Sequence, residues 1–289
     1  MTLRPRGPRW PRRLLAAHTA AVYLFLYAPI AVLVAFSFNS ARQTAAWQGF
    51  TLSWYGEMLR DERLLRAVRN SLVVASLATV LATVIGTMAA LALAPPAARP
   101  GRDGRDDRDD RDDRDDRRQR FRAATQVLLL LPVILPEVVL GAALLTLFGV
   151  SRLRLSLVTV LIAHVVFSIS YVALVVRARL AGLDPTLAEA ARDLGAGGWE
   201  VFRRVTLPLA MPGIAAGALL VFTLSIDDYV ITSFVAGAGA TTLPLHIYSL
   251  LKAGVTPEVN AVSAALLLVT VTLIALAQWL LARDAGSLA

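Results

Sequence analysis

Long apolar stretches separated by short polar segments dominate the chain. A helix needs roughly 20 mostly apolar residues to cross a bilayer, and six stretches reach that length. They are Leu14–Phe38, Ser71–Ala94, Ala124–Val150, Leu155–Val176, Gly213–Val235 and Val259–Ala282. The pattern therefore predicts an all-α membrane protein with six transmembrane helices in one domain over residues 14–283.

The first apolar stretch follows a basic N-terminal arm, residues 1–13, and in this respect resembles a signal peptide. An h-region has only about 7–15 apolar residues. The stretch Leu14–Phe38 is much longer, so we expect it to be retained as a helix.

Composition supports the membrane assignment. Hydrophobic residues make up 56% of the chain, the mean hydropathy is +0.61, and there is no cysteine for a disulfide or a thiolate metal site. The net charge is +8, but the arginines cluster in polar segments beside apolar spans. Such clustering is typical of cytoplasmic loops, so nucleic acid is not expected as a partner.

Arginine counts predict the orientation. The N-terminal arm, the loop 95–123 and the loop 177–212 are rich in arginine and fall on one side of a six-span chain. The segment 39–70 on the other side breaks the trend with five arginines. The balance still favours a cytoplasmic location for both termini and for the loop 177–212.

The loop after the second span contains an Arg-Asp-Asp repeat. Between Gly101 and Arg120 it has no apolar residue, so packing cannot offset the entropy of ordering. We expect residues 99–122 to be a cytoplasmic insert without regular structure, although Asp107 and Arg111 could support a transient helix as an i,i+4 pair. A neutral solvated expansion is favoured over an electrostatic tether.

The polar segment 178–212 cannot lie in lipid, because unpaired backbone groups there cost several kcal/mol each. Asp184 and Pro185 form a typical helix start, and Gly195 can end that helix. A second short helix is expected over Trp199–Val205. The prolines Pro208 and Pro212 should limit its continuation into the fifth span.

The spacing Glu189-Ala190-Ala191, Gly195, Val205, Leu207-Pro208 resembles the EAA loop of ABC-importer permeases. Val205 stands where that family usually has isoleucine. The resemblance implies a type I ABC-importer permease fold, like that of the methionine importer, and a loop that docks onto a separate ATP-binding subunit. The implied coupling residues are Glu189, Ala190, Ala191, Asp193, Gly195, Leu207 and Pro208.

Further motifs resemble the second permease subunit of spermidine/putrescine importers over most of residues 66–283, the core of the domain. They are Asn70-Ser71-Leu72, Leu131-Pro132 through Pro136-Glu137, His164, Phe222–Asp228, Ala240–Leu245 and Pro257–Ala261. The implied partners are an ATP-binding subunit, a second and different permease subunit, an extracytoplasmic substrate-binding protein and the bilayer of the bacterial inner membrane. ATP and Mg²⁺ would belong to the partner ATPase, and no cofactor is expected in this chain.

Several polar residues lie within the apolar spans. Asp227 and Asp228 fall about 21 Å from the cytoplasmic end of the fifth span, at 1.5 Å per residue. Ser225, Asp228, Tyr229 and Thr232 fall at i, i+3, i+4 and i+7, so we expect them to form one polar stripe on this span. Carboxylates at this depth usually face a cavity or a partner. They either contact a cationic substrate or serve a structural role, by pairing with Arg or Lys at the subunit interface or by capping a broken helix.

Two other polar residues lie near the middle of a span. Glu137 follows Pro136 in the third span, where a proline kink could expose it to the substrate path. His164 in the fourth span is more typical of a hydrogen bond between helices than of a ligand site. The candidate substrate path therefore comprises Asp227, Asp228, Ser225, Tyr229 and Glu137.

No phosphate-binding loop, HExxH or GxSxG pattern occurs in the chain, so catalysis is not expected. The leading hypothesis is a polyamine importer permease. One alternative is an importer of another small solute, such as an opine, ferric iron or thiamine. A second is an ion-driven secondary transporter that uses the intramembrane carboxylates.

Overall fold

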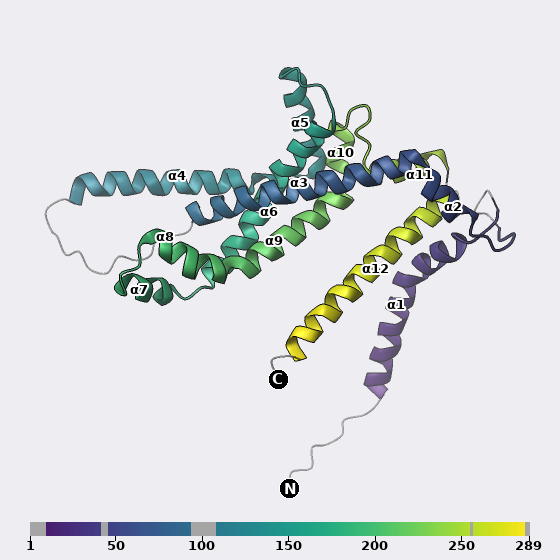
Figure 1. The fold of residues 1–289 in the computed structure, drawn as a ribbon, viewed down its shortest axis with the longest axis horizontal. Coiled ribbons are helices and arrows are strands. Elements are labelled where there is room, and N and C mark those ends of the chain that lie inside the picture. Colours follow the sequence, from purple (N-terminus) through teal and green to yellow (C-terminus); the bar gives the residue numbers. More distant parts are fainter. Residues whose placement is uncertain (1–9, 42–45, 94–107, 255–256, 287–289) are drawn as a thin grey trace, which may run out of the picture. The chain divides into compact units, whose positions relative to one another are not determined.

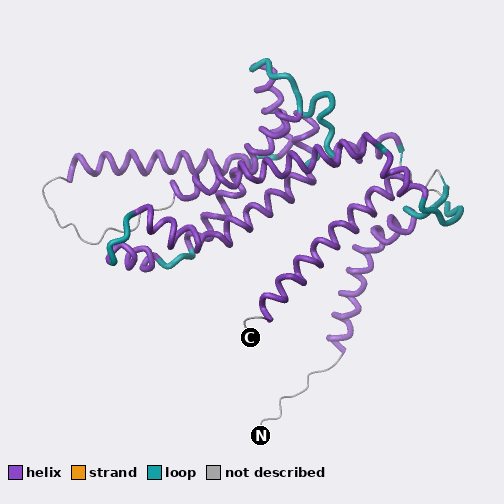
Figure 2. Tube along the Cα trace, in the orientation of Figure 1, coloured by secondary structure: helices purple, strands orange, loops and turns teal. Residues whose placement is uncertain are grey.

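The computed structural model describes residues 10–41, 46–93, 108–254 and 257–286. The described parts consist of helices and loops, with one isolated bridge between Asn39 and Phe50 (Figure 2). Contacts divide the chain into one unit of residues 1–65 and 247–289 and a second unit of residues 66–246. The fold class predicted from the apolar pattern, an all-α protein, is confirmed.

The first unit contains α1 (Trp10–Phe36), α2 (Ser53–Arg60) and α12 (Pro257–Gly286). Helix α12 packs against α1 and α2. Asn39 orders the loop after α1: its side chain bonds to the backbone of Ala41, Ala46 and Gln48.

The second unit is built from most of α3 (Glu62–Leu93) and from the helices that follow it to the start of α11 (Leu243–Ala253), as shown in Figure 1. These are α4 (Arg108–Ile134), α5 (Glu137–Val150), α6 (Leu157–Ala181), α7 (Pro185–Asp193), α8 (Gly198–Val201), the π-helical turn η1 (Phe202–Thr206), α9 (Leu207–Asp227) and α10 (Val230–Val235). Helix α6 packs against α4, α9 and α10, so it lies at the centre of this unit.

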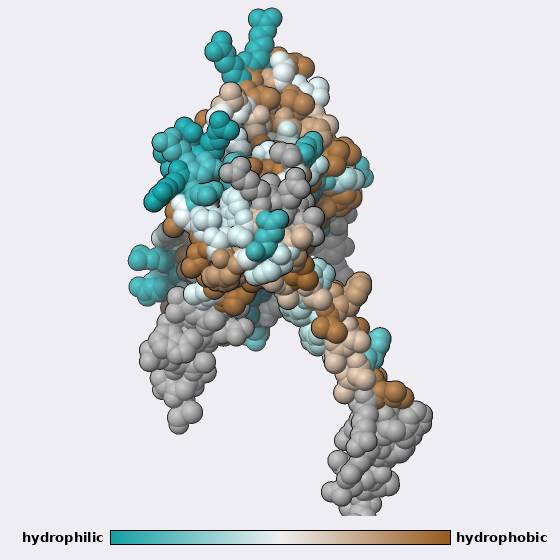
Figure 3. Space-filling model, turned by 90° about the vertical axis from the view of Figure 1, so that its right-hand side faces the viewer, coloured by the Kyte–Doolittle hydropathy of each residue, from teal (hydrophilic) through white to brown (hydrophobic). Residues whose placement is uncertain are grey.

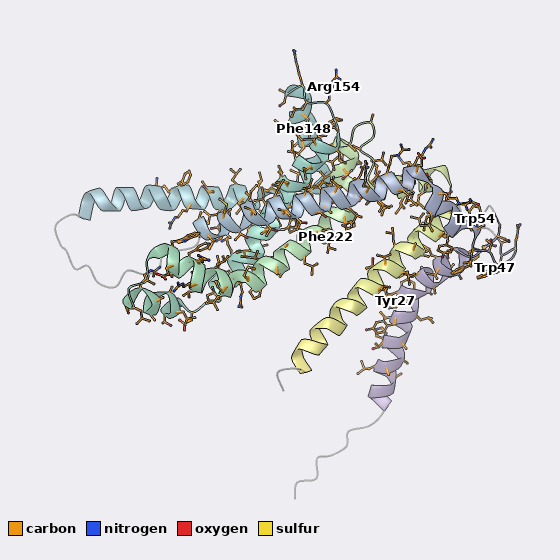
Figure 4. The ribbon with its side chains drawn as sticks, viewed as in Figure 1. Tyr27, Trp47, Trp54, Phe148, Arg154 and Phe222 are labelled. Atoms are coloured by element: carbon orange, nitrogen blue, oxygen red, sulfur yellow. The ribbon has the colours of Figure 1, made fainter. Side chains whose placement is uncertain are left out.

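Two apolar clusters hold the second unit together. One joins α5, α6 and α10 through buried side chains such as Phe148, Val160 and Ile231. Phe148 is labelled on α5 in Figure 4. The other joins α3, α6 and α9 through Ala82, Val172 and Val221. Brown apolar residues nevertheless reach the surface in Figure 3, and many leucines and valines are exposed, as expected where helices face lipid or partner chains.

Four helices among the described residues are long and apolar enough to cross a membrane: Leu14–Phe36, Glu62–Leu93, Leu157–Ala181 and Gly198–Asp227. They correspond to the first, second, fourth and fifth predicted spans. A bent helix pair raises the number to five if it counts as one span. In α12 the described side chains cover the apolar segment Pro257–Thr272. The predicted number of six spans is therefore not confirmed.

The third predicted span is not one continuous helix. Helices α4 and α5 meet at an angle of 109° between Ile134 and Glu137. Pro136 precedes the first residue of α5 with φ −57° and ψ 137°. Its ring favours extended backbone in the residue before it and removes a hydrogen-bond donor, so the chain turns here instead of continuing.

The fifth predicted span differs at both ends. It begins earlier, because α8, η1 and α9 form a continuous apolar helix from Gly198. The second short helix expected over Trp199–Val205 is therefore the start of a long one. The π turn lies directly before Pro208, where a regular α-helix would lose a hydrogen bond. The helix stops at Asp227, and α10 is a separate helix.

Part of the Arg-Asp-Asp segment is helical. Helix α4 begins at Arg108, so the expectation that residues 99–122 lack regular structure does not hold for the part from Arg108 onward. This helix runs directly into the apolar stretch. Residues 99–107 of this segment, like 1–9 of the basic arm, lie outside the described residues.

Candidate functional site

The first candidate site is the polar loop between α6 and α9. Helix α7 begins at Asp184, whose carboxylate accepts hydrogen bonds from the Thr186 backbone N–H at 2.9 Å and from its hydroxyl at 2.8 Å. These bonds lower the pKa of the Asp184 carboxyl, the hydroxyl contributing most. Pro185 follows as the first helical residue, so the N-terminal capping predicted from Asp184 and Pro185 is confirmed.

Gly195 ends α7 as the sequence indicated. Its φ is +89°, in the left-handed region that favours glycine. The N–H of Ala196 donates to the carbonyl of Ala191 at 3.0 Å, and the N–H of Gly195 donates to that of Arg192 at 2.9 Å. This pair of bonds is a Schellman motif, and it reverses the chain so that α7 packs against α8.

Helix α7, the turn at Gly195 and α8 form a compact knob whose surface has both polar and apolar side chains. Glu189 and Ala191 are half-buried, whereas Ala190, Asp193 and Gly195 are exposed. Two large apolar side chains also project from it: Leu194 is 89% exposed and Trp199 is 71% exposed. Large apolar side chains this exposed on a polar loop are typical of a surface that a partner covers.

The knob is joined directly to a membrane span. From Gly198 to Asp227 the chain is one helix of 30 residues. Its hydrogen-bond pattern is π-helical at η1. At 1.5 Å per residue it is about 45 Å long. Leu207 and Pro208 are the first residues of α9 within it. The knob and the far end of α9 are therefore joined by this one helix.

The second candidate site lies at that far end. After Asp227 the helix stops, and Asp228 adopts an extended backbone with ψ 122°. The Asp228 carboxylate accepts hydrogen bonds from the N–H of Thr232 at 2.9 Å, from the N–H of Ile231 at 3.3 Å and from the Thr232 hydroxyl at 2.7 Å. It thus bonds to the free backbone N–H groups of the first turn of α10.

His164 completes this cluster from α6. Its Nδ1 lies 2.7 Å from the Ser225 hydroxyl on α9, and its Nε2 lies 2.9 Å from the Thr232 hydroxyl and 3.3 Å from the Asp228 carboxylate. Only 1% of His164 is exposed. The interpretation of His164 as an interhelical hydrogen-bonding residue is confirmed, and of the two readings of the aspartate pair, the capping of a broken helix applies to Asp228.

Ser225, Asp228 and Thr232, which the sequence analysis placed on one polar stripe, do lie in one cluster, but for another reason. They do not form a stripe on one helix, because the helix breaks between Ser225 and Thr232. They meet around His164, a residue that the sequence analysis did not connect with them. The signal that could have found it is the position of His164 midway along α6, where a lone polar ring needs partners from neighbouring helices.

The remaining candidates lie outside this cluster. Asp227 is exposed at the last residue of α9, and Tyr229 is half-buried beside the break. Glu137 is exposed at the first turn of α5, at the bend that follows α4. Asp227, Tyr229 and Glu137 therefore remain accessible, whereas Ser225 and Asp228 are buried.

The described residues contain no group of three or more His, Cys, Asp or Glu side chains that could hold a metal ion. The arrangement is that of a helical membrane protein with a polar knob at one end of a long helix and a polar helix break at the other end.

Comparison with known families identifies the class. The family model described as "Binding-protein-dependent transport system inner membrane component" matches residues 116–283, more than half of the chain. This chain belongs to that family of inner membrane transport permeases.

Two curated relatives extend the match beyond residues 116–283. The chain is 39% identical over 275 residues to the spermidine/putrescine transport system permease protein PotC of Escherichia coli (strain K12), covering 94% of this chain and 95% of that protein. It is 40% identical over 267 residues to the putrescine transport system permease protein PotI of the same organism, covering 90% and 87%.

Solved structures share the fold at low identity. A bacterial ABC transporter involved in the import of the acidic polysaccharide alginate matches with a TM-score of 0.67 and 17% identity, covering 96% of this chain and 99% of that chain. The MetNI methionine ABC transporter in an inward-facing conformation matches with a TM-score of 0.58 and 21% identity, covering 76% and 95%. The chain therefore has the fold of ABC-importer permeases, including that of the methionine importer.

Proposed function

We propose that this chain is a permease subunit of an ATP-driven polyamine importer, and that the knob around α7 couples it to a separate ATP-binding subunit. The substrate class is supported by the relatives PotC and PotI, which are permeases of spermidine/putrescine and putrescine transport systems. Their coverage of the chain is nearly complete, so the likeness extends over both candidate sites.

The observation that carries the coupling role is the continuous helix from Gly198 to Asp227. The knob at its cytoplasmic end has a shape fixed by the Asp184 cap and the Gly195 turn. It exposes Leu194 and Trp199 outside the bilayer. A partner that binds these side chains can displace the helix Gly198–Asp227 and so move the helix break at its other end.

The remaining architecture follows from the same proposal. Six spans, both termini in the cytoplasm, a second permease subunit of different sequence and an extracytoplasmic binding protein complete the importer. ATP and Mg²⁺ act in the ATP-binding subunit, so this chain has no catalytic residue of its own. Closure of the ATPase dimer would draw the knobs of the two permeases together and switch the pair from inward- to outward-facing.

The exposed carboxylates Asp227 and Glu137 are proposed to face the substrate path. A protonated polyamine carries a positive charge on each amine, and carboxylates within a span are paired with a partner or face a cavity. Tyr229, beside the helix break, offers a ring and a hydroxyl to the same path. Buried Ser225 and Asp228 contribute to this path by holding its wall in place.

The test is ATPase activity in proteoliposomes that contain this chain with its co-purifying partners. Putrescine-loaded binding protein should stimulate ATP hydrolysis, and Glu189→Lys should abolish the stimulation because it reverses a charge on the knob. Glu57→Lys is the matched control, since Glu57 is an exposed glutamate on α2, outside the knob, and should leave stimulation intact.

Each alternative gives a different result. Stimulation by a binding protein loaded with another solute, and none with polyamine, would retain the importer and reject the polyamine. Transport that proceeds without an ATP-binding subunit and depends on a proton or sodium gradient would reject the importer.

A further inference from the structure

The segment 39–70 carries five arginines on the side of the membrane where the positive-inside pattern predicts few. Four of them belong to the described residues, and all four are exposed: Arg60, Arg63, Arg66 and Arg69. Neither the coupling knob nor the proposed substrate path includes them. Arg66 and Arg69 lie at the start of α3, in the second unit of the chain. Their exposed charge therefore needs an explanation of its own.

Arg66 and Arg69 begin a stripe of exposed residues along α3. Positions three or four residues apart share one face of a helix, and so do positions seven apart. From Arg69 this spacing leads to Val73, Val80 and Val84, which are 40%, 62% and 55% exposed. The opposite face of α3 supplies the buried side chains of the two apolar clusters. A row of exposed valines on a helix long enough to span a membrane is typical of a surface in contact with lipid tails.

The length of the stripe fits the bilayer. From Val73 to Met88 it extends about 22 Å at 1.5 Å per residue, which is most of the roughly 30 Å hydrocarbon core. Arg69 precedes Val73 by four residues, or about 6 Å. The headgroup layer on each side of the core is about 5–8 Å thick, and an arginine side chain can extend into it from the edge of the core. Arg69 therefore lies at the level of the lipid headgroups.

Arg69 has no acidic residue within a turn of itself along α3. Glu62 is the only acidic residue of this helix, and it precedes Arg69 by seven positions. It precedes Arg66 by four, a spacing that favours an ion pair, so Arg69 is the stronger candidate to bind an external anion. The start of the helix is already capped, because the Asp61 carboxylate accepts a hydrogen bond from the Arg63 backbone N–H at 2.8 Å. The group that can bind an anion here is thus the Arg69 guanidinium.

We propose that Arg69, supported by Arg66, binds the phosphate of an anionic lipid headgroup at the end of α3 that the arginine counts place outside the cytoplasm. A guanidinium can donate two parallel N–H bonds to one phosphate. The valine stripe next to it contacts the acyl chains of the same lipid. This contact involves neither the substrate nor the ATP-binding subunit, so it goes beyond the proposed function and can fail without it.

The same turn of α3 also holds a loop of the protein. Asn70 follows Arg69 and is buried. Its Nδ2 donates to the carbonyl of Gly239 at 3.1 Å and to that of Thr241 at 3.0 Å. Both carbonyls belong to the loop between α10 and α11. A lipid bound by Arg69 thus contacts the turn of α3 that fixes this loop.

The test uses a fluorescent label on the valine stripe. The chain contains no cysteine, so Val73→Cys provides a single labelling site in it, four residues from Arg69. A bimane label at this site is quenched by a lipid with a nitroxide on its acyl chain when that lipid contacts the helix. The assembled complex is reconstituted in phosphatidylcholine vesicles with a small fraction of nitroxide-labelled phosphatidylglycerol or, separately, nitroxide-labelled phosphatidylcholine. The complex without Val73→Cys, treated in the same way, gives the background from partner chains.

We expect the label to be quenched at a concentration of phosphatidylglycerol about fivefold or more below that of phosphatidylcholine. Arg69→Gln should reduce this preference about fivefold, which is the contribution of one basic residue near an anionic surface. Arg69→Lys keeps the charge and should retain most of the preference. Arg154→Gln is the matched control, because Arg154 is an exposed arginine on the loop after α5 (Figure 4), and it should leave the preference unchanged.

Three results would overturn the proposal. Absence of quenching by both lipids would show that another protein chain covers the stripe. Equal quenching by the two lipids, unchanged in Arg69→Gln, would show lipid contact without recognition of the headgroup. An equal loss of preference in Arg69→Gln and Arg154→Gln would show a general attraction of anionic lipid to a basic surface.

Discussion

Gly237 lies where the loop after α10 passes over the start of α6, and a side chain there should destabilise the protein. A Cβ atom at Gly237 would lie 1.8 Å from the carbonyl oxygen of Leu155 and 2.9 Å from the backbone nitrogen of Ser156. Real Cβ contacts are essentially never below 3.0 Å, so the two backbones would have to separate by about 1.2 Å.

That separation would disturb hydrogen bonds between the start of α6 and the end of α10. The Thr159 hydroxyl donates to the carbonyl of Val235 at 2.8 Å and accepts from the N–H of Ser156 at 2.8 Å, so it ties the start of α6 to the end of α10. Overpacking typically costs about 1–3 kcal/mol, and here backbone has to move. At roughly 2–4 °C per kcal/mol for a chain of this size, Gly237→Ala should lower the Tm by about 2–12 °C.

The assay is loss of the monodisperse peak in size-exclusion chromatography after heating the detergent-solubilised complex. The matched control is Gly149→Ala on α5, because a Cβ there has no atom within 4 Å. Alanine in place of a helical glycine stabilises by roughly 0.5–1 kcal/mol, so the control should not lose stability. A Gly237→Ala complex that survives heating as well as the control would refute the close-approach reasoning.

Two further predictions concern the knob. The pKa of Asp184 lies below its usual value of 3.8, so its bonds to Thr186 support α7 at neutral pH and are lost as pH falls through that lowered pKa. Asp184→Asn should remove this acid sensitivity, measured as hydrogen exchange in α7 corrected for intrinsic rate. The exposed i,i+4 pair of Glu200 and Arg204, 2.9 Å apart, should contribute less than about 0.5 kcal/mol. Glu200→Gln should therefore leave the Tm and the coupled ATPase rate unchanged, and a large loss would mean that Glu200 contacts the partner.

Local chemistry made the knob predictable. Asp184, Pro185 and Gly195 act within one turn of their own position: a carboxylate caps the nearest N–H, a ring presets φ, and a glycine adopts positive φ. Such effects need no knowledge of distant residues, so the start and the end of α7 agree with the prediction. Four of the six predicted membrane spans agree with long apolar helices of the structure, because the length and hydropathy of a stretch determine whether it can cross a bilayer.

Proline had less predictable effects. At Pro136 the chain bends by 109° between α4 and α5. Pro208, in contrast, lies within a continuous helix that contains a π turn just before it. Both residues remove the same donor. The difference depends on whether neighbouring backbone can rearrange and remain bonded, and that depends on packing partners remote in the sequence.

The sequence by itself determined the class of protein: apolar spans, a capped polar knob between two of them, and carboxylates far along the fifth apolar stretch. Only the tertiary structure decided what those carboxylates do. Asp227 and Asp228 are neighbours with the same side chain, yet the first is exposed and the second is buried against His164. The reason is physical: the helix break turns one aspartate toward the free N–H groups of α10 and a ring from α6, and hydrogen bonds between segments more than 60 residues apart leave no periodic trace in the sequence.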